Sequence, residues 1–349
     1  MLTFLTPILD ARQPQQIQRA GELIRQGGLV AFPTETVYGL GALGLNEVSV
    51  GKIFAAKDRP AHNPLILHVE HKNQAALLFN FDACADPVTA RAIFEKLSDA
   101  FWPGPLTMVC YKKDHVPDIV TAGSSKVAVR VPSHPVALAL LQYLQAPVAA
   151  PSANASSRPS ATTAAHVQHT LDGKLDAILD GGPCQHGLES TVIDISQNPP
   201  QLLRMGAISL ETILNIEPKT TWRPIGLATH EATGSPGLVC KHYAPQIEKI
   251  ELVESSQMQN LWLSQASFLL RQSTADQLNQ QIGQRLKGTV TISLPDDPVF
   301  YAQKLYAALY DLEQSKTPWL VIEKMPAYDA QDLWLSILDR LARASSLDP

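Results

Sequence analysis

Short apolar runs that alternate with helical stretches are the feature that most constrains the fold of this chain. A short apolar run closed by a turn residue is typical of a buried strand, and apolar residues spaced three and four apart indicate an amphipathic helix. Because the two kinds of segment alternate, the sequence predicts an α/β architecture. The expected strands lie at residues 29–32, 64–69, 106–111, 127–131, 148–150, 177–179 and 191–195. The expected helices lie at residues 17–26, 48–57, 135–144 and 164–171.

A segment rich in proline and glycine divides the chain. Residues 217–246 show no sustained periodicity and are typical of a linker or an extended loop. A chain of 349 residues is also long for a single hydrophobic core. We therefore expect a first domain at 1–216, the linker at 217–246 and a smaller α/β domain at 247–349. In the last part, strands are expected at 247–253, 267–270, 289–293 and 319–323, and helices at 299–313 and 333–344.

Composition is that of a globular protein without a broad nucleic-acid surface. Apolar residues make up 45% of the chain and charged residues 17%, and the net charge is −5. Broad binding to nucleic acid depends on clustered Lys and Arg, so we expect no stable nucleic-acid complex. A local basic pocket for a small anion remains compatible with this charge.

The cysteines and the N-terminal segment indicate a cytoplasmic protein without a membrane partner. The first twenty residues lack the basic start of a signal peptide, and no apolar run reaches membrane-spanning length. The cysteines lie far apart and form no zinc-binding pair, so we expect reduced thiols in a reducing compartment. They are Cys84, Cys110, Cys184 and Cys240.

Two motifs in the first hundred residues place polar groups where predicted strands or helices end, and the ends of strands are where open α/β sheets bind ligands. PTETVYGLG, at 33–41, brings two hydroxyls, a carboxylate and a phenol after a buried strand. The alternative is an ordinary turn with a threonine cap, which explains the same residues. Lys57 and Arg59 stand at a helix end before Asn63, and together they can converge on a polyphosphate. Their alternative is a helix end whose cations suit the dipole. His68 lies within an apolar strand and is equally explained as a core histidine.

Two later motifs have the same character. PSANASSRPS, at 151–160, follows a strand with small residues whose backbone N–H groups can reach a phosphate. A flexible serine-rich loop has the same composition and is the alternative. GGPCQHGLESTV, at 181–192, places Ser190 at the start of the next strand, with Arg204 beyond it. Arg130 is a charge within a strand, so it requires an anionic partner, either a ligand or a protein carboxylate. None of these motifs is a P-loop, a dinucleotide fingerprint or a nucleophile elbow.

The motifs taken in order resemble those of a known family. PTETVYGLG, KDRP with NPLILHV, FWPGPLT, VAVRVPSHP, PSAN with SRPS, and GLESTVID follow one another from about Gly28 to Arg204. They closely resemble the YrdC-like threonylcarbamoyl-AMP synthases. SPG at 235–237 with HYAP at 242–245 resembles the linker of the longer, two-domain form. The resemblance implies a twisted, open mixed sheet in the first domain and a smaller, Rossmann-like α/β domain at the C-terminus.

The resemblance also implies a reaction. Enzymes of this family join L-threonine, bicarbonate and ATP to give threonylcarbamoyl-AMP and pyrophosphate, which makes them nucleotidyltransferases, and they use Mg²⁺ with the ATP. A tRNA threonylcarbamoyl-transferase complex then uses the product to form N6-threonylcarbamoyladenosine in tRNA. Catalysis needs no protein nucleophile, because the carbamate itself attacks the α-phosphorus, and it rests on positioning and charge.

The family pattern assigns a role to each matching position. It implies that Lys57 and Arg59 are the catalytic cations and that Tyr243 covers the site as a lid, with an interdomain tether as the alternative. The implied threonine pocket comprises Thr36, His68, Arg130, Ala150 and Ser190. The implied ATP site comprises Lys57, Arg59, Asn63, Lys126, Ser152, Asn154, Ser160, Arg204 and Tyr243.

Two other functions compete with this interpretation. The first is a non-catalytic module that binds double-stranded RNA or tRNA on a basic concave face. The second is an enzyme acting on other carbamoyl-adenylates, as in hydrogenase maturation factors. The acidic net charge and the complete set of motif residues favour the synthase over the RNA-binding module.

Overall fold

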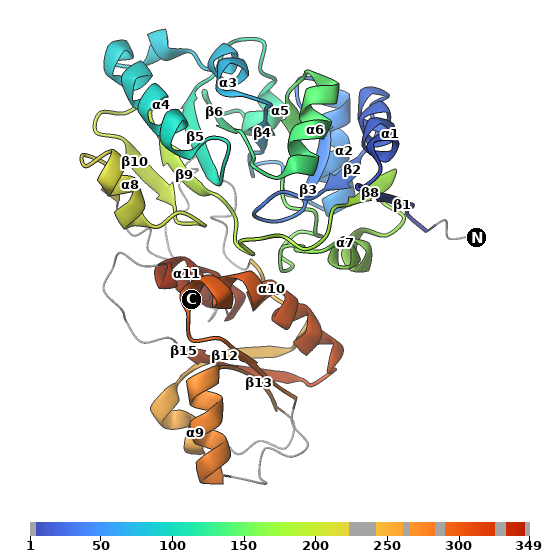
Figure 1. The fold of residues 1–349 in the computed structure, drawn as a ribbon, viewed down its shortest axis with the longest axis vertical. Coiled ribbons are helices and arrows are strands. Elements are labelled where there is room, and N and C mark those ends of the chain that lie inside the picture. The colour runs from blue at the N-terminus through green and yellow to red at the C-terminus, as the bar shows by residue number, and fades with distance from the viewer. Residues whose placement is uncertain (1–4, 223–241, 261–265, 283–289, 325–332, 346–349) are drawn as a thin grey trace.

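The protein consists of two α/β units stacked on each other (Figure 1). The computed structural model describes residues 5–222, 242–260, 266–282, 290–324 and 333–345. The SPG segment of the linker, at 235–237, lies outside these residues, and so does Cys240. Cys84, Cys110 and Cys184 are buried free thiols, as the sequence predicts.

The first unit is built on a mixed sheet whose described strands follow the order β1-β8-β2-β3-β7-β4-β6-β5-β9-β10-β11. Parallel pairs such as β4 with β6 alternate with antiparallel pairs such as β5 with β6, so the expected mixed sheet is confirmed. The strands are β1 (Ile8–Asp10), β2 (Val30–Phe32), β3 (Gly39–Leu43), β4 (Ile66–His68), β5 (Leu106–Tyr111), β6 (Lys126–Arg130), β7 (Val148–Ala149), β8 (Ala177–Asp180), β9 (Thr191–Asp194), β10 (Gln201–Arg204) and β11 (Thr221–Trp222).

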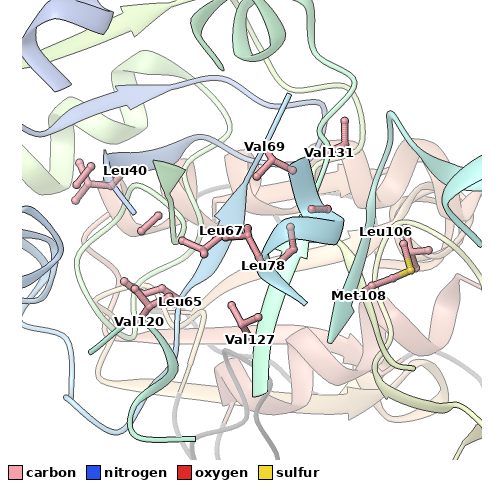
Figure 2. Packing of buried hydrophobic residues seen from close by; sticks show 14 of the residues in the cluster. Leu40, Leu65, Leu67, Val69, Leu78, Leu106, Met108, Val120, Val127 and Val131 are labelled. Carbon is pink, nitrogen blue, oxygen red and sulfur yellow. The ribbon is translucent and has the colours of Figure 1, made fainter. Parts of the chain in front are cut away.

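Helices cover this sheet because successive strand residues point to opposite faces. Ala31 of β2 packs in the larger core, which includes the side chains of Figure 2, whereas its neighbours Val30 and Phe32 pack in a second core with α1 and α6. The helices of this unit are α1 (Pro14–Arg25), α2 (Glu47–Lys57), α3 (Lys72–Leu78), α4 (Pro87–Phe101), α5 (Asp118–Thr121), α6 (Pro135–Leu144), α7 (Ala164–Leu171) and α8 (Leu210–Ile216), with the 3-10 turn η1 (Phe81–Ala83).

The second unit is a smaller parallel sheet in the order β12-β15-β13-β14. Figure 1 shows α10 and α11 between this sheet and the first unit, and α9 on the far side. A parallel sheet with helices on both faces is the Rossmann-like arrangement that the sequence predicts. Its elements are β12 (Lys249–Glu254), η2 (Ser255–Asn260), β13 (Ala266–Arg271), α9 (Gln272–Ile282), β14 (Thr291–Leu294), α10 (Pro298–Gln314), β15 (Trp319–Lys324) and α11 (Trp334–Ser345).

The core of the second unit continues into the first. Val37 and Leu188, from two of the motif loops, belong to the same buried cluster as α10 and α11. Tyr243, near the end of the linker, joins that cluster. The two units therefore share one apolar interface, and polar contacts described below surround it.

Several elements differ from the expectation. β3 (Gly39–Leu43) pairs with β2. Its sequence, GLGAL, is typical of a loop, because glycine has a low strand propensity. β11 pairs with β10 in the large sheet, within the range assigned to the linker. The division of the chain at 216 and 246 stays a prediction. Among the described helices, none combines the length and hydropathy of a membrane-spanning segment.

Candidate active site

A cavity of about 60 Å³ lies where the motif loops of the first unit meet His242 and Tyr243, near the end of the linker. Open α/β sheets place ligands in such a position, outside strand ends and beside loops. The side chains around it come from segments far apart in the sequence. Among the residues expected at the site, the cavity is lined by Thr36, Arg59, His68, Arg130, Ala150, Ser152, Ser190, Arg204 and Tyr243.

Arg130, the last residue of β6, is buried beside the cavity with its guanidinium in an ion pair. It donates to Glu35 Oε1 at 2.5 Å, to Thr36 Oγ1 at 2.9 Å and to the carbonyl of Gly104 at 3.2 Å. Burial raises the pKa of Glu35, but Arg130 outweighs it and holds that pKa below its usual value. The partner of Arg130 in this structure is therefore a protein carboxylate, one of the two alternatives that the sequence left open. A guanidinium has five N–H donors, so these three bonds leave capacity for a ligand anion.

His68 stands opposite Arg130 in the parallel pairing of β4 with β6. Its ring is 3% exposed, its Nδ1 has no hydrogen-bond partner, and it meets Phe32 edge-on. Burial and then the charge of Arg130 lower the pKa of His68 to about 3. The imidazole is therefore neutral at pH 7, and its buried Nδ1 is available to a polar ligand in the cavity.

Ser190 and Arg204 form another part of the cavity wall. Arg204, at the end of β10, donates to the backbone carbonyl of Ser190 at 2.9 Å and to its hydroxyl at 3.2 Å. Thr107 of β5 contacts the same hydroxyl at 2.7 Å. Thr107 and Arg204 stand on β5 and β10, the two strands that flank β9. The Ser190 hydroxyl and the Arg204 guanidinium are therefore held in a defined orientation.

Arg59 lines the cavity, whereas Lys57 lies behind it. Arg59 donates to the carbonyls of Asn63 at 3.1 Å and Pro64 at 2.8 Å. Lys57 is 1% exposed, and its Nζ donates to the backbone carbonyls of Ser152 and Asn154. A cation at a helix end is ordinarily exposed, but Arg59 is only partly exposed and Lys57 is buried, because α2 turns its last residue into the loop at 151–160. Lys57 therefore organises the loop, which presents Ser152 to the cavity.

Burial changes the acidity of both cations. Burial and then Arg204 lower the pKa of Arg59 to about 10, so it keeps its charge at pH 7. Burial and then Arg59 hold the pKa of Lys57 well below its usual value.

Besides Lys57, four of the residues expected at the ATP site do not line the cavity. Asn63 and Asn154 are buried beside it, and Asn154 Nδ2 donates to the carbonyls of Ala155 and Arg158 at 2.9 Å. Ser160 donates to a cavity carboxylate rather than facing the cavity. The structure does not bring Lys126 to the site: its Nζ pairs with Asp194 at 2.7 Å, at the opposite end of β6 from Arg130.

Glu189 is a lining residue that sequence reasoning missed as a site residue. Its carboxylate accepts from Ser160 Oγ at 2.6 Å, from the hydroxyl of Tyr306 at 3.1 Å and from Nε of Arg340 at 3.2 Å. Burial raises the pKa of Glu189, but Arg340 and Arg204 outweigh it and keep that pKa below its usual value. Its place in GLEST was the available signal. Tyr306 and Arg340 lie in helices without a motif, so no local signal could have found them.

Tyr243 lines the cavity and also packs on the second unit. Its ring stacks on Tyr306 with centroids 5.6 Å apart, and the guanidinium of Arg340 lies 5.7 Å from its centroid. The backbone of Tyr243 has a φ of 64°, and the next amide, of Ala244, donates to the carbonyl of Ser157 at 2.9 Å. The last residues of the linker are thus bound to both units.

Comparison with known proteins gives this arrangement a family. A family model for Sua5, YciO and YrdC proteins, described as telomere recombination, matches residues 22–206. A model described as the threonylcarbamoyl-AMP synthase C-terminal domain matches residues 208–346. The chain belongs to the threonylcarbamoyl-AMP synthase family, in its two-domain form. The resemblance noted from the motifs is therefore confirmed.

Two relatives and one structure show how much of the chain this membership covers. The threonylcarbamoyl-AMP synthase of Pyrococcus abyssi is 36% identical over 99% of this chain and 98% of its own length. That of Schizosaccharomyces pombe is 34% identical over 95% of this chain and 88% of its own. The crystal structure of P. abyssi Sua5 complexed with L-threonine has a TM-score of 0.85, with 35% identity and 97% of each chain covered.

The cavity suits a magnesium ion that arrives with a nucleotide better than a resident ion. Among the described residues there is no group of three or more His, Cys, Asp or Glu side chains placed to hold a metal. The carboxylate at the cavity, Glu189, already accepts from three side chains. Mg²⁺ keeps several waters and binds phosphate oxygens readily, so the hydroxyls of Thr36, Ser152 and Ser190 fit its outer shell.

Proposed function

We propose that the cavity between Arg130 and Arg204 is where this chain forms threonylcarbamoyl-AMP from L-threonine, bicarbonate and ATP. The chain is a threonylcarbamoyl-AMP synthase by family, and the finer class proposed here is a nucleotidyltransferase that releases pyrophosphate. The observation that supports this site best is the presence of three guanidinium groups, of Arg59, Arg130 and Arg204, around one cavity. Such cations suit two anionic substrates and a polyanionic leaving group.

The threonine end of the site is proposed at Arg130. A planar guanidinium binds a carboxylate through two parallel bonds, and Arg130 retains unused donors beside Thr36. The neutral ring of His68 and the hydroxyl of Ser190 are placed to bind the amino acid's polar groups, with Ala150 packing on it. The L-threonine bound by P. abyssi Sua5 supports an amino-acid pocket in this cavity.

The nucleotide end is proposed at Arg59, Ser152 and Arg204. Their charges and hydroxyl suit the triphosphate, with Lys57 holding the loop that carries Ser152. Asn63, Asn154 and Ser160 then act from behind the lining, and a role for Lys126 requires it to leave Asp194. When bound with ATP, Mg²⁺ supplies charge neutralisation of the phosphates.

The proposed reaction has two bond-forming steps. The neutral amine of threonine attacks the carbon of bicarbonate, giving a carbamate and water. A carbamate oxygen then attacks the α-phosphorus of ATP, the bond from that phosphorus to the bridging oxygen breaks, and pyrophosphate leaves. Arg59 and Arg204 stabilise the negative charge that builds on the leaving group, which is the main task of a protein in such transfers.

Opening of the site is part of the proposal. Cavities that hold drug-sized ligands measure about 300–1,000 Å³, so one of about 60 Å³ is too small for ATP. His242 and Tyr243 line it and belong to neither sheet, so we assign the movement to them. Tyr243 then acts as a lid that keeps water from the adenylate.

The experiment is the complete reaction with radiolabelled threonine, ATP, Mg²⁺ and bicarbonate, followed by separation of the adenylate and measurement of pyrophosphate. We expect release that depends on both threonine and bicarbonate. Release that continues when threonine is omitted would identify a simple ATPase. Use of the product by a tRNA threonylcarbamoyl-transferase complex, and a cytoplasmic location, are further parts of the proposal. Coupled tRNA modification and cell fractionation test them.

A further inference from the structure

Helix α11 of the second unit holds both sides of the Ser190–Arg204 wall. Arg340 Nε contacts the carboxylate of Glu189, the residue before Ser190, at 3.2 Å. Its NH1 donates to the carbonyl of Met205, the residue after Arg204, at 2.8 Å. One buried side chain therefore connects the two chain segments that carry the wall.

Neighbouring contacts reinforce this connection. Ser336, one turn earlier on α11, donates to the carbonyl of Gly206 at 3.0 Å. Tyr306 of α10 donates to Glu189 while its ring stacks on Tyr243. The second unit thus contacts the cavity carboxylate, the segment after Arg204 and the residue that we assign as the lid.

We propose that Arg340, assisted by Tyr306, is a positioning residue that the second domain supplies to the nucleotide end of the active site. This inference rests on the proposed function. Arg340 does not line the cavity itself; it contacts Glu189 and Tyr243, which do, and the carbonyl of Met205. Its role is to keep the Ser190 carbonyl and hydroxyl where they orient Arg204.

Charge gives a second reason for Arg340. Glu189 is a buried carboxylate among the cavity cations Arg59 and Arg204. A buried carboxylate without a partner is costly, so it would pair with the nearest cation. Arg340 and Tyr306 pair with Glu189 from outside the cavity, so Arg59 and Arg204 remain available to bind phosphate. The expected defect on losing Arg340 is therefore larger for ATP than for threonine.

The test uses Arg340→Gln in the full chain, with Arg271→Gln as the matched control. Arg271, at the end of β13, is partly buried and pairs with the fully buried Glu323 in the same domain, and so reports the structural cost of losing a charge partner there. We expect Arg340→Gln to raise the KM for ATP about 10-fold or more and to lower kcat/KM for ATP about 100-fold. The KM for threonine should rise by less than the KM for ATP, since Ser190 is the residue of the threonine end that adjoins the partners of Arg340, whereas Arg130 and His68 are held by other contacts. The Arg271 control should melt earlier with both KM values unchanged.

A second variant keeps the inference testable if Arg340→Gln fails to fold. Tyr306→Phe removes one hydrogen bond to Glu189 and keeps the ring against Tyr243, so it should show the same defect with smaller amplitude. Calorimetric titration with ATP supplies a readout that needs no turnover.

Two results overturn the inference: an unchanged KM for ATP in both variants, or equal increases in both KM values. A parent protein that binds ATP but makes no adenylate contradicts the proposed function instead. In that case the calorimetric affinities of the variants still decide the role of Arg340.

Discussion

Arg130 and Lys57 show that a charged side chain can be recognised from its motif while its partner is not. The motif placed Arg130 at the end of a strand and left open whether its anion is a ligand or a protein carboxylate. The structure brings Glu35 from another loop to within 2.5 Å. Lys57 was recognised as a cation near a helix end, yet it is buried against carbonyls of a loop about a hundred residues later.

Replacing Arg130 by Lys should affect threonine far more than ATP. An ammonium can keep the ion pair with Glu35 but cannot make a bidentate contact with a carboxylate. We expect the KM for threonine to rise about 10- to 100-fold, a loss of about 1.4–2.8 kcal/mol, with ATP affinity nearly unchanged. Steady-state kinetics in each substrate measures this. An equal loss of ATP affinity would place Arg130 at the phosphate end or in a purely structural pair.

Lys57→Ala and Arg59→Ala should separate stability from turnover. Arg59→Ala should lose about 100-fold or more in kcat, because a cation that faces the leaving group is worth that much. Lys57→Ala should lose turnover indirectly, by releasing the loop that presents Ser152 to the cavity. Lys57→Ala should also unfold more easily by about 1–3 kcal/mol, since it leaves the buried carbonyls of Ser152 and Asn154 without a donor. Arg59 is partly exposed and should cost less stability. Thermal melts beside the kinetics decide this, and equal melting of the two variants would contradict the buried position of Lys57.

The buried histidines predict a decrease in stability toward acid. The pKa of His68 is lowered to about 3, so between pH 6.5 and 3 the unfolded chain binds a proton that the folded chain does not. Stability contributed by the neutral ring is present above pH 6.5 and is lost as the pH falls to about 3. One such proton changes the free energy of unfolding by about 1.4 kcal/mol per pH unit.

His68→Phe should reduce that slope by up to one proton, measured by urea unfolding at several pH values. His242 has the same lowered pKa of about 3 and should contribute equally, so part of the slope remains in the variant. An unchanged slope would show that His68 is hydrated in solution.

At the scale of elements, α10 is a buried brace for the loop at 151–160 as well as part of the second core. Glu313, near its C-terminal end, pairs with Arg158 at 2.5 Å, and Tyr310 donates to the carbonyl of Pro159 at 2.7 Å. These contacts explain how a serine-rich loop is held in one conformation beside the cavity. The loop is therefore ordered by a helix more than a hundred residues later.

Glu313→Gln should destabilise the protein by about 3 kcal/mol, because it leaves the largely buried Arg158 without its charge partner. Glu95→Gln is the control, since its pair with Lys72 is more exposed and should be worth about 0–1 kcal/mol. Urea unfolding compares the two. Equal effects would mean that the Arg158 pair is solvated and that α10 does not brace the loop.

At the scale of the whole molecule, the two units share a core and a cavity. The cluster of α10 and α11 includes Val37, Leu188 and Tyr243, all beside cavity residues. Ligands that bind the cavity therefore contact segments that the second unit holds. Unfolding of either unit should remove binding.

We accordingly expect one calorimetric transition for both units, which moves upward with ATP and threonine together. Saturation at 100 times Kd corresponds to about 2.7 kcal/mol of stabilisation for each ligand bound to the folded state alone. Differential scanning calorimetry measures it. Two transitions, of which only the lower shifts, would show that the second unit does not contribute to the site.

The predicted elements agree best with the structure where local pattern and burial coincide. The strand at 106–111 and the helices at 135–144 and 164–171 match β5, α6 and α7 to the residue. The misses have local causes. β3 is glycine-rich, and α9 is a polar run whose apolar face is recognisable only against its sheet. Among the site residues, those in the motifs could be predicted from the sequence, because the chemistry requires their residue types at short spacing.

The sequence by itself determined the α/β class, the order of the motifs and the family to which they belong, because these depend on periodicity and on short runs of residues. Only the tertiary structure decided which charges meet: Arg130 with Glu35, Lys57 with two loop carbonyls, and Arg340 with Glu189. Those contacts join residues up to 151 positions apart. Their existence depends on how two separately recognisable units pack against each other, and no local pattern records that packing.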